Sequence, residues 1–333
     1  MTARPKIAFV GTGGTMSSLG AGPLDLHDYG ATGLRLHADA LLARFPETAS
    51  VADVIAVPYR NVPSPAMGFA DWKALVQIAD GLTAAHPDLA GIVIGHGTAT
   101  LEETAYALHL TLKTPLPVVL TGAQRPASAL SSDTGLNLVN AIRVAASPAA
   151  RGMGVLVVLN DEIHAAREVA KTATHRLQTF RTADFGALGH ADGDEVAFYR
   201  RPVRRGAPDT EFDIRALDAL PRVDIAYAHA DPDGTDVRAF VGAGARGIVS
   251  AGFAPGLAPP DQGAALEDAV AQGVVVVQST RVGSGRVFPA SRLRAAGILT
   301  ADNLTPQKAR ILLALALAVT ADRGAIGRIF AQY

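Results

Sequence analysis

The chain lacks cysteine altogether, has few aromatic side chains and has no surplus of either charge. Without a thiol it forms no disulfide, thiolate zinc site or iron–sulfur cluster, and it has no cysteine nucleophile. Only 5% of its 333 residues are aromatic, which disfavours a stacking platform for nucleic-acid bases. Its 30 Lys and Arg balance 31 Asp and Glu, so there is no basic surplus for nucleic-acid binding. We therefore expect no nucleic-acid partner.

Long apolar runs are also missing. The longest near the C-terminus, Ile311 to Thr320, is about half of what a membrane span needs. The first residues, Met1 to Lys6, pass directly into the short run Ile7–Val10 and do not have the pattern of a secretory signal. With 49% apolar and 18% charged residues, the composition is typical of a well-buried globular protein. These features predict a soluble, cytoplasmic protein that does not bind membranes.

Short runs rich in Val and Ile alternate with amphipathic stretches. Because most of these runs are apolar throughout, they predict strands buried on both faces, as in a parallel sheet covered by helices. The predicted strands are Ile7–Val10, Val54–Val57, Gly91–Ile94, Pro117–Leu120, Val155–Leu159, Val223–Tyr227, Gly247–Val249 and Val274–Gln278. The predicted helices are Asp71–Thr83, Leu101–Leu112, Leu136–Ala146 and Gln307–Val319. The alternation predicts the α/β class.

A segment rich in arginine and proline interrupts this rhythm near residues 200–220. We expect a linker over 206–220. It would join a larger N-terminal α/β domain with a parallel or mixed sheet, residues 1–205, to a smaller C-terminal α/β domain, residues 221–333. The length fits two domains at roughly 150 residues each.

Glycines and threonines follow the first and third predicted strands. After Val10 comes Gly-Thr-Gly-Gly-Thr, which ends at Thr15, and after Ile94 comes Gly-His-Gly-Thr-Ala-Thr, which ends at Thr100. Ligands bind at the carboxyl ends of strands in open α/β sheets, so each hydroxyl is a candidate site residue. The alternative for the first motif is a simple tight turn. It lacks the Lys-Ser/Thr of a phosphate loop and the full dinucleotide fingerprint.

The second motif leads into a helix, so one of its threonines is expected to be an N-cap. Thr100 is the better candidate for that role, which leaves Thr98 free. His96, between two glycines, is more typical of a structural hydrogen-bond donor than of a base.

Charged residues follow the strand that ends at Leu159. A lysine such as Lys171 is normally solvated, but a buried lysine has a lowered pKa and can act as a base. Asp161, Glu162 and His164 match no strong metal motif, so no metal is expected. Two threonines and a lysine fit nucleophilic hydrolysis, because a threonine nucleophile needs a neighbouring base. They fit a small-molecule binding protein equally well.

Five segments resemble the bacterial type I/II L-asparaginase family, in order along nearly the whole chain. They are Gly11–Thr15, His96–Thr104, Thr121–Asn137, Asn160–Thr172 and Thr305–Arg310. The resemblance implies an amidohydrolase that uses neither cofactor nor metal and forms an acyl-enzyme. It implies a homodimer or homotetramer with its sites at the subunit interface. Thr15 would be the nucleophile, activated by Tyr29, and Thr98 with Lys171 would relay a proton. Gly14, Ser64, Pro65, Gly97 and Ala99 would contact substrate, Ser64 holding a carboxylate.

The departures from the family pattern concern the pocket for the α-ammonium group. The family places Asp after the second threonine, where this chain has Ala99. Two further ammonium ligands of the family align with Ala254 and Ala290 of this chain. Pro65 stands at a position where the family often has Gln. We therefore expect a small amide, imide or lactam substrate without a free α-ammonium. The alternatives are an L-asparaginase or glutaminase, with Ala99 as an inactivating substitution, and a weakly catalytic small-molecule binding protein.

Overall fold

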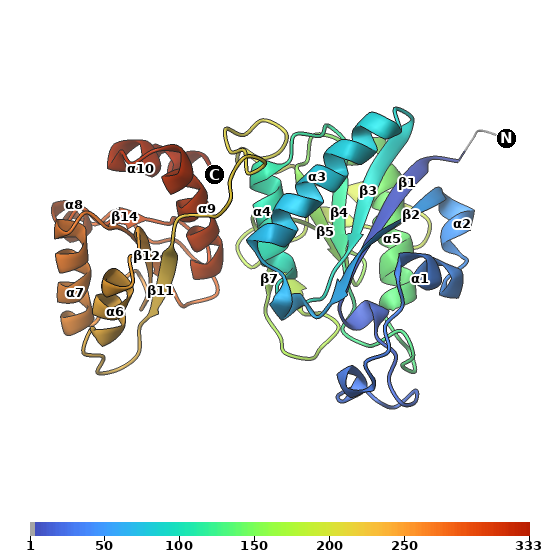
Figure 1. The fold of residues 1–333 in the computed structure, drawn as a ribbon, viewed down its shortest axis with the longest axis horizontal. Coiled ribbons are helices and arrows are strands. Elements are labelled where there is room, and N and C mark those ends of the chain that lie inside the picture. The colour runs from blue at the N-terminus through green and yellow to red at the C-terminus, as the bar shows by residue number, and fades with distance from the viewer. Residues whose placement is uncertain (1–3) are drawn as a thin grey trace. The chain divides into compact units, whose positions relative to one another are not determined.

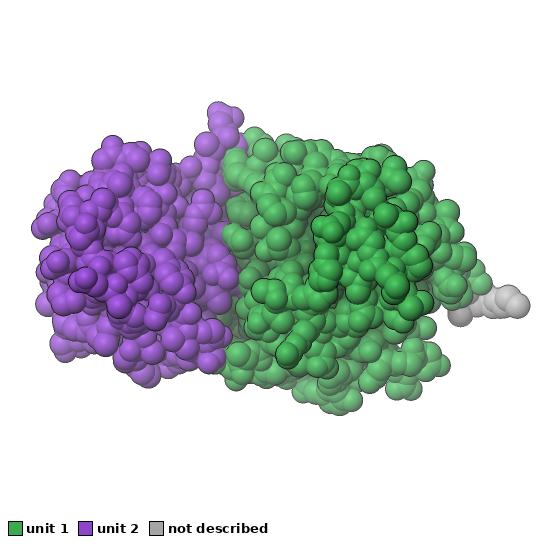
Figure 2. Space-filling view, turned by 90° about the horizontal axis from the view of Figure 1, so that it is seen from below, with its two compact units in different colours: residues 1–211 green, residues 212–333 purple. Residues whose placement is uncertain are grey.

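The computed structural model describes residues 4–333; the first three residues of the predicted N-terminal domain lie outside that range. The chain divides into two compact units, Met1–Glu211 and Phe212–Tyr333, coloured separately in Figure 2. The division falls within the segment 206–220 that the sequence suggests as a linker. Within residues 4–333, no helix combines the length and apolar character needed to cross a membrane.

The first unit is built on a mixed sheet of eight strands. Its order is β10-β9-β6-β5-β4-β3-β1-β2. The strands β2, β1, β3, β4 and β5 pair in parallel, whereas the pairs β5–β6, β6–β9 and β9–β10 are antiparallel. The bounds are Lys6–Gly13 (β1), Asp53–Val62 (β2), Leu89–Gly95 (β3), Val118–Thr121 (β4), Val155–Leu159 (β5), Glu162–Ala165 (β6), Gly189–His190 (β9) and Ala197–Phe198 (β10). A separate hairpin pairs β7 (Ala170–Lys171) with β8 (Phe180–Arg181).

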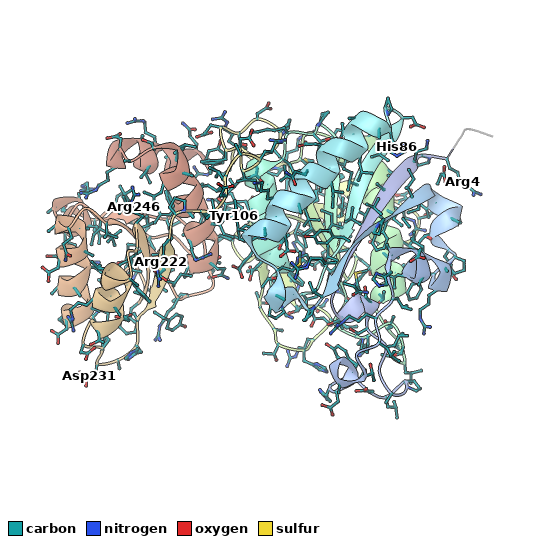
Figure 3. The ribbon with its side chains drawn as sticks, viewed as in Figure 1. Arg4, His86, Tyr106, Arg222, Asp231 and Arg246 are labelled. Carbon is teal, nitrogen blue, oxygen red and sulfur yellow. The ribbon has the colours of Figure 1, made fainter. Side chains whose placement is uncertain are left out.

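Helices cover both faces of this sheet (Figure 1). They are α1 (Ala38–Arg44), α2 (Thr48–Val51), α3 (Phe69–Ala85), α4 (Leu101–Thr111) and α5 (Thr134–Ala146). Alternate residues of β1, Ile7 and Phe9, belong to the same apolar core as Leu41 of α1 and Ile142 of α5. The helices α3 and α4 pack on the opposite face (Figure 1). Figure 3 marks Tyr106 on α4, whose side chain is fully buried.

The second unit is a four-stranded parallel sheet in the order β11-β12-β13-β14. The strands are Val223–Tyr227 (β11), Gly247–Gly252 (β12), Val275–Thr280 (β13) and Leu299–Thr300 (β14). The helices are α6 (Thr235–Gly242), α7 (Pro260–Ala271), α8 (Ser291–Ala295), α9 (Pro306–Val319) and α10 (Arg323–Gln332). Val237, Leu266 and Leu293, from α6, α7 and α8, form a core with Ile248 and Val276 of the sheet.

All eight predicted strands and all four predicted helices are present, and the α/β class is confirmed. The prediction for the side chain of Thr100 is wrong. Thr100 stands at the N-cap position of α4, but its hydroxyl makes no cap; it donates to the carbonyl oxygen of Ser64, at 2.8 Å. The hydroxyl is thus turned toward the neighbouring loop and not toward the free N–H groups of the helix.

Candidate active site

The carboxyl ends of three neighbouring parallel strands meet at one edge of the large sheet. In the register of β1 with β3, Gly11 faces Gly95, and in that of β1 with β2, Gly13 faces Val62. The loops after these strands therefore begin side by side. They contain Thr15, Thr98 and Ser64, respectively.

Two glycines shape the turn that presents Thr15. Gly13 and Gly14 have φ angles of 103° and 80°, in the region that favours glycine. A Cβ atom on Gly14 would lie 2.2 Å from the Cα of Gly97, so the first two loops touch backbone to backbone. This contact fixes the spacing between Thr15 and the loop of Thr98.

Thr15 forms a hydroxyl pair with Tyr29. The Thr15 Oγ1 and the Tyr29 phenolic oxygen lie 2.9 Å apart. Tyr29 begins the short helix η2 (Tyr29–Thr32) in an excursion that leaves and rejoins the fold at a bridge between Ser18 and Arg35. Backbone bonds on either side of that bridge, Leu19 N to Leu34 O at 3.0 Å and Leu36 N to Ser17 O at 2.7 Å, hold the base of the excursion.

A second pair joins Thr98 to Lys171 of β7. The Lys171 Nζ donates to the Thr98 Oγ1 at 2.7 Å, and the Thr98 side chain is buried. Burial lowers the pKa of Lys171, while the charge of nearby Glu102 acts in the opposite direction. A lowered pKa brings the neutral amine, the form that a general base needs, closer to neutral pH.

Ser64 is buried and ties its own loop to the second motif. Its Oγ accepts a hydrogen bond from the backbone N–H of Ala99 at 3.1 Å, in addition to the bond that its carbonyl oxygen accepts from Thr100. The hydroxyl thus lies beside position 99.

One cavity of about 270 Å³ brings these groups together. The structure places all nine predicted site residues in its lining: Gly14, Thr15, Tyr29, Ser64, Pro65, Gly97, Thr98, Ala99 and Lys171. The sequence reasoning did not identify four others, Ser18, Gly30, Arg35 and Pro63. Arg35 lies at the return of the excursion, and no local motif marks it. Lys171 and Arg35 are the basic side chains of the lining, and none of the lining residues in the described chain carries a carboxylate.

His96 is buried and does not line the cavity. Its Nδ1 lies 2.8 Å from the carbonyl oxygen of Gly97, so the ring donates a structural hydrogen bond. Burial lowers its pKa to about 4, which keeps it neutral at neutral pH. This geometry supports a structural role.

The acidic cluster after β5 is tied into the fold. Asp161 accepts a hydrogen bond from Asn140 at 2.8 Å, and Glu162 lies 3.3 Å from both His164 and Arg181. Across residues 4–333, no three His, Cys, Asp or Glu side chains form a group suited to a metal ion.

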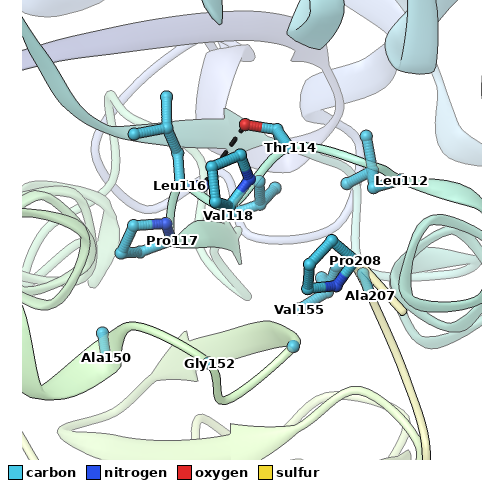
Figure 4. Close-up of a pocket in the computed structure, with 12 residues that line it drawn as sticks. Leu112, Thr114, Leu116, Pro117, Val118, Ala150, Gly152, Val155, Ala207 and Pro208 are labelled. Carbon is cyan, nitrogen blue, oxygen red and sulfur yellow. Dashed lines mark hydrogen bonds between the residues drawn. The ribbon is translucent and has the colours of Figure 1, made fainter.

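A second hollow in the first unit is too small for a substrate. It lies between Leu112, Pro117, Val155 and Pro208, where Thr114 accepts a bond from the N–H of Leu116 (Figure 4). Its volume is about 10 Å³, room for one water molecule.

Known proteins match the chain over its full length. The family model "Asparaginase, N-terminal" covers residues 6–204, and "Glutaminase/Asparaginase C-terminal domain" covers residues 222–330. L-asparaginase 2 of Bacillus subtilis (strain 168) is 39% identical, over 99% of this chain and 87% of its own. L-asparaginase 2 of Escherichia coli (strain K12) is 37% identical, over 99% and 94%. The crystal structure of a probable cytoplasmic L-asparaginase from Campylobacter jejuni aligns with a TM-score of 0.94 and 36% identity, covering 99% of this chain and 100% of that one.

These matches define the class of protein first: a hydrolase that acts on carbon–nitrogen bonds other than peptide bonds. Within that class, the chain belongs to the asparaginase family, whose two-domain α/β fold it shares. This assignment favours the enzymatic interpretations of the site over a small-molecule binding protein.

Proposed function

We propose that this enzyme hydrolyses a small amide, imide or lactam that lacks a free α-ammonium group. The observation that supports this most directly is the lining of the cavity. It holds two hydroxyl pairs suited to amide hydrolysis, but at position 99 it has the methyl group of Ala99 instead of a carboxylate. An ammonium group enclosed there would lose its hydration without gaining a charged partner, which is costly.

The proposed reaction begins at Thr15. Its Oγ1 attacks the amide carbonyl carbon while its proton passes to the Tyr29 oxygen, 2.9 Å away, and the phenolic proton of Tyr29 passes on to the leaving nitrogen. The carbon–nitrogen bond then breaks, the nitrogen leaves with a proton, and an ester joins the acyl group to Thr15. Water adds to this ester and gives a proton to the Thr98–Lys171 pair. The ester bond then breaks, the acid departs, and the same pair returns a proton to the Thr15 oxygen.

The Thr98–Lys171 pair is proposed to relay protons for these steps. A neutral Lys171 amine accepts the Thr98 hydroxyl proton across the 2.7 Å hydrogen bond, and Thr98 in turn takes one from the attacking water. The lowered pKa of Lys171 supports this role, because it increases the neutral fraction at a given pH.

The second candidate is hydrolysis of L-asparagine. The names of the relatives favour it, since proteins 37–39% identical to this chain are called L-asparaginase 2. In that case groups other than a lining carboxylate of the first unit hold the ammonium.

Ammonia release from two substrates separates the candidates. L-Asparagine is compared with succinamic acid, the same molecule without its α-amine, with the Thr15→Ala variant as the control. Turnover of succinamate in preference to asparagine supports our proposal, and preference for asparagine refutes it. If neither reacts, Ala99→Asp is assayed: a gain of asparaginase activity identifies Ala99 as an inactivating substitution. Activity that survives in Thr15→Ala contradicts the assignment of the nucleophile.

We also propose a cytoplasmic homodimer or homotetramer that needs no cofactor. The structural relative from Campylobacter jejuni is described as cytoplasmic, whereas a relative from Haemophilus influenzae is described as periplasmic. Light scattering of the purified protein tests the oligomeric state. Fractionation of the cells that naturally make it tests the compartment. A monomer that is fully active, or recovery from the periplasm, would contradict the proposal.

A further inference from the structure

The cavity carries positive charge that its own lining does not balance. Lys171 is bonded to Thr98 and lies within the field of Glu102. Arg35 is different: it lines the cavity and is half-buried, yet its guanidinium has no hydrogen bond or ion pair to any residue from 4 to 333. An unpaired cation of this kind attracts an anion into the site.

Arg35 is held in place by its backbone. It pairs with Ser18 in an isolated bridge, directly beside the Leu36 N–H to Ser17 O bond. The bridge closes the excursion that contains Tyr29, so Arg35 lies at its base, and both residues line the same cavity. A ligand that engages Arg35 is therefore within the cavity that holds the Thr15–Tyr29 pair.

We propose that Arg35 is a specificity-determining residue that binds a carboxylate of the substrate, and that the substrate is an anionic amide without an ammonium group. This inference rests on the proposed function for the reaction and narrows its substrate class. The guanidinium presents several N–H donors in a plane that matches a carboxylate, and such charge-assisted pairs are among the stronger hydrogen bonds in proteins. The Ser64 hydroxyl offers a further polar contact in the same cavity.

The electrostatic argument separates three kinds of amide. A neutral amide leaves Arg35 partly desolvated and unpaired when it fills the cavity. A zwitterion such as asparagine supplies a carboxylate but also brings an ammonium into a cavity that holds the Arg35 guanidinium and has no lining carboxylate to balance it. An amide with a carboxylate and no amine supplies the counter-charge alone, so it is the form that the lining favours.

Kinetics of Arg35→Gln test the proposal. For succinamate, KM should rise about tenfold or more with kcat little changed, because the carboxylate contact is made in both ground and transition states. For succinamide, its neutral analogue, KM should not change. Arg35→Lys should recover part of the loss, which a merely structural role would not produce. Arg151→Gln is the matched control, since Arg151 is exposed and outside the cavity. Equal KM values for succinamate in wild type and Arg35→Gln would overturn the proposal.

Binding provides a readout that does not depend on turnover. In the Thr15→Ala background, calorimetry measures the binding of succinate. One of its carboxylates represents the acid formed from the amide, and the other represents the carboxylate proposed to contact Arg35. We expect Arg35→Gln to weaken binding about tenfold or more. No detectable binding to Thr15→Ala alone, or unchanged binding after the second substitution, refutes the role of Arg35. If succinate binding depends on Arg35 but wild type releases no ammonia from any amide, the proposed function fails while this inference stands.

Discussion

The buried His96 makes the stability of the fold depend on pH in a calculable way. Its side chain is fully buried, and burial lowers its pKa from 6.5 to about 4. The unfolded chain therefore binds this proton more readily than the folded one between these two values. Stability contributed by neutral His96 is complete above the unfolded pKa and is lost as the pH falls towards 4.

The size of the effect follows from the shift. The difference between 6.5 and about 4 corresponds to roughly 3 kcal/mol between the limits of high and low pH. Between about pH 7.5 and about pH 5, linkage gives a loss of about 2 kcal/mol from this one group. That is a large share of the total stability of most domains.

Urea unfolding at several pH values measures the loss, with His96→Gln beside wild type. The variant has no group to protonate at this position, so its free energy of unfolding should fall by about 2 kcal/mol less over the same interval. His37→Gln, at an exposed histidine, is the control and should follow wild type. Parallel curves for His96→Gln and wild type would refute the reasoning, whatever their separation.

Three further predictions concern the site. Lys171→Met should lower turnover about 100-fold or more, because it removes the proposed base while leaving the cavity in place; steady-state kinetics with normal turnover would contradict that role. The lowered pKa of Lys171 should place the rising limb of kcat/KM below the ordinary lysine value of 10.5, and Ala99→Asp should move the limb to higher pH, since an added anion favours the ammonium form. Gly14→Ala should abolish activity and lower Tm, because its Cβ would lie 2.2 Å from Gly97 Cα at a φ of 80°. In the matched Gly81→Ala variant in helix α3, the new Cβ would meet no atom within 4 Å beyond its own helix backbone, so Tm should stay level or rise. Equal losses in both variants would refute the contact argument.

Local sequence patterns predict much of the fold. Apolar runs such as Val155–Leu159 locate the buried strands, because only strands covered on both faces are apolar throughout. The two-residue strands β7 and β8 have no such signal. Their pairing, Ala170 with Arg181 and Lys171 with Phe180, depends on how the intervening loop folds back. Periodicity cannot specify a pair this short.

Some residues of the candidate site could likewise be identified from local sequence, and others could not. Thr15 and Thr98 could be identified because each follows a buried strand in a glycine-rich turn. Arg35 could not, because its place in the cavity results from the return of an excursion to Ser18. The prediction for Thr100 failed for a related reason. A helix start suggests a hydroxyl that accepts from the backbone, but the Thr100 hydroxyl donates to the carbonyl oxygen of Ser64 on a neighbouring loop.

The way the site is built explains how its specificity can change without loss of its chemistry. The spacing of the two threonine loops is set by the contact of Gly14 with Gly97, and the hydroxyl pairs follow from strand register. Positions 35 and 99 take no part in that framework through their side chains: Arg35 is fixed by its backbone bridge, and Ala99 donates to Ser64 through its N–H. Changing either side chain alters the charge of the cavity while the backbone that aligns the reacting groups is kept. A carboxylate at position 99 and a neutral residue at 35 would suit an ammonium-bearing amide, whereas the pair present here suits an anion.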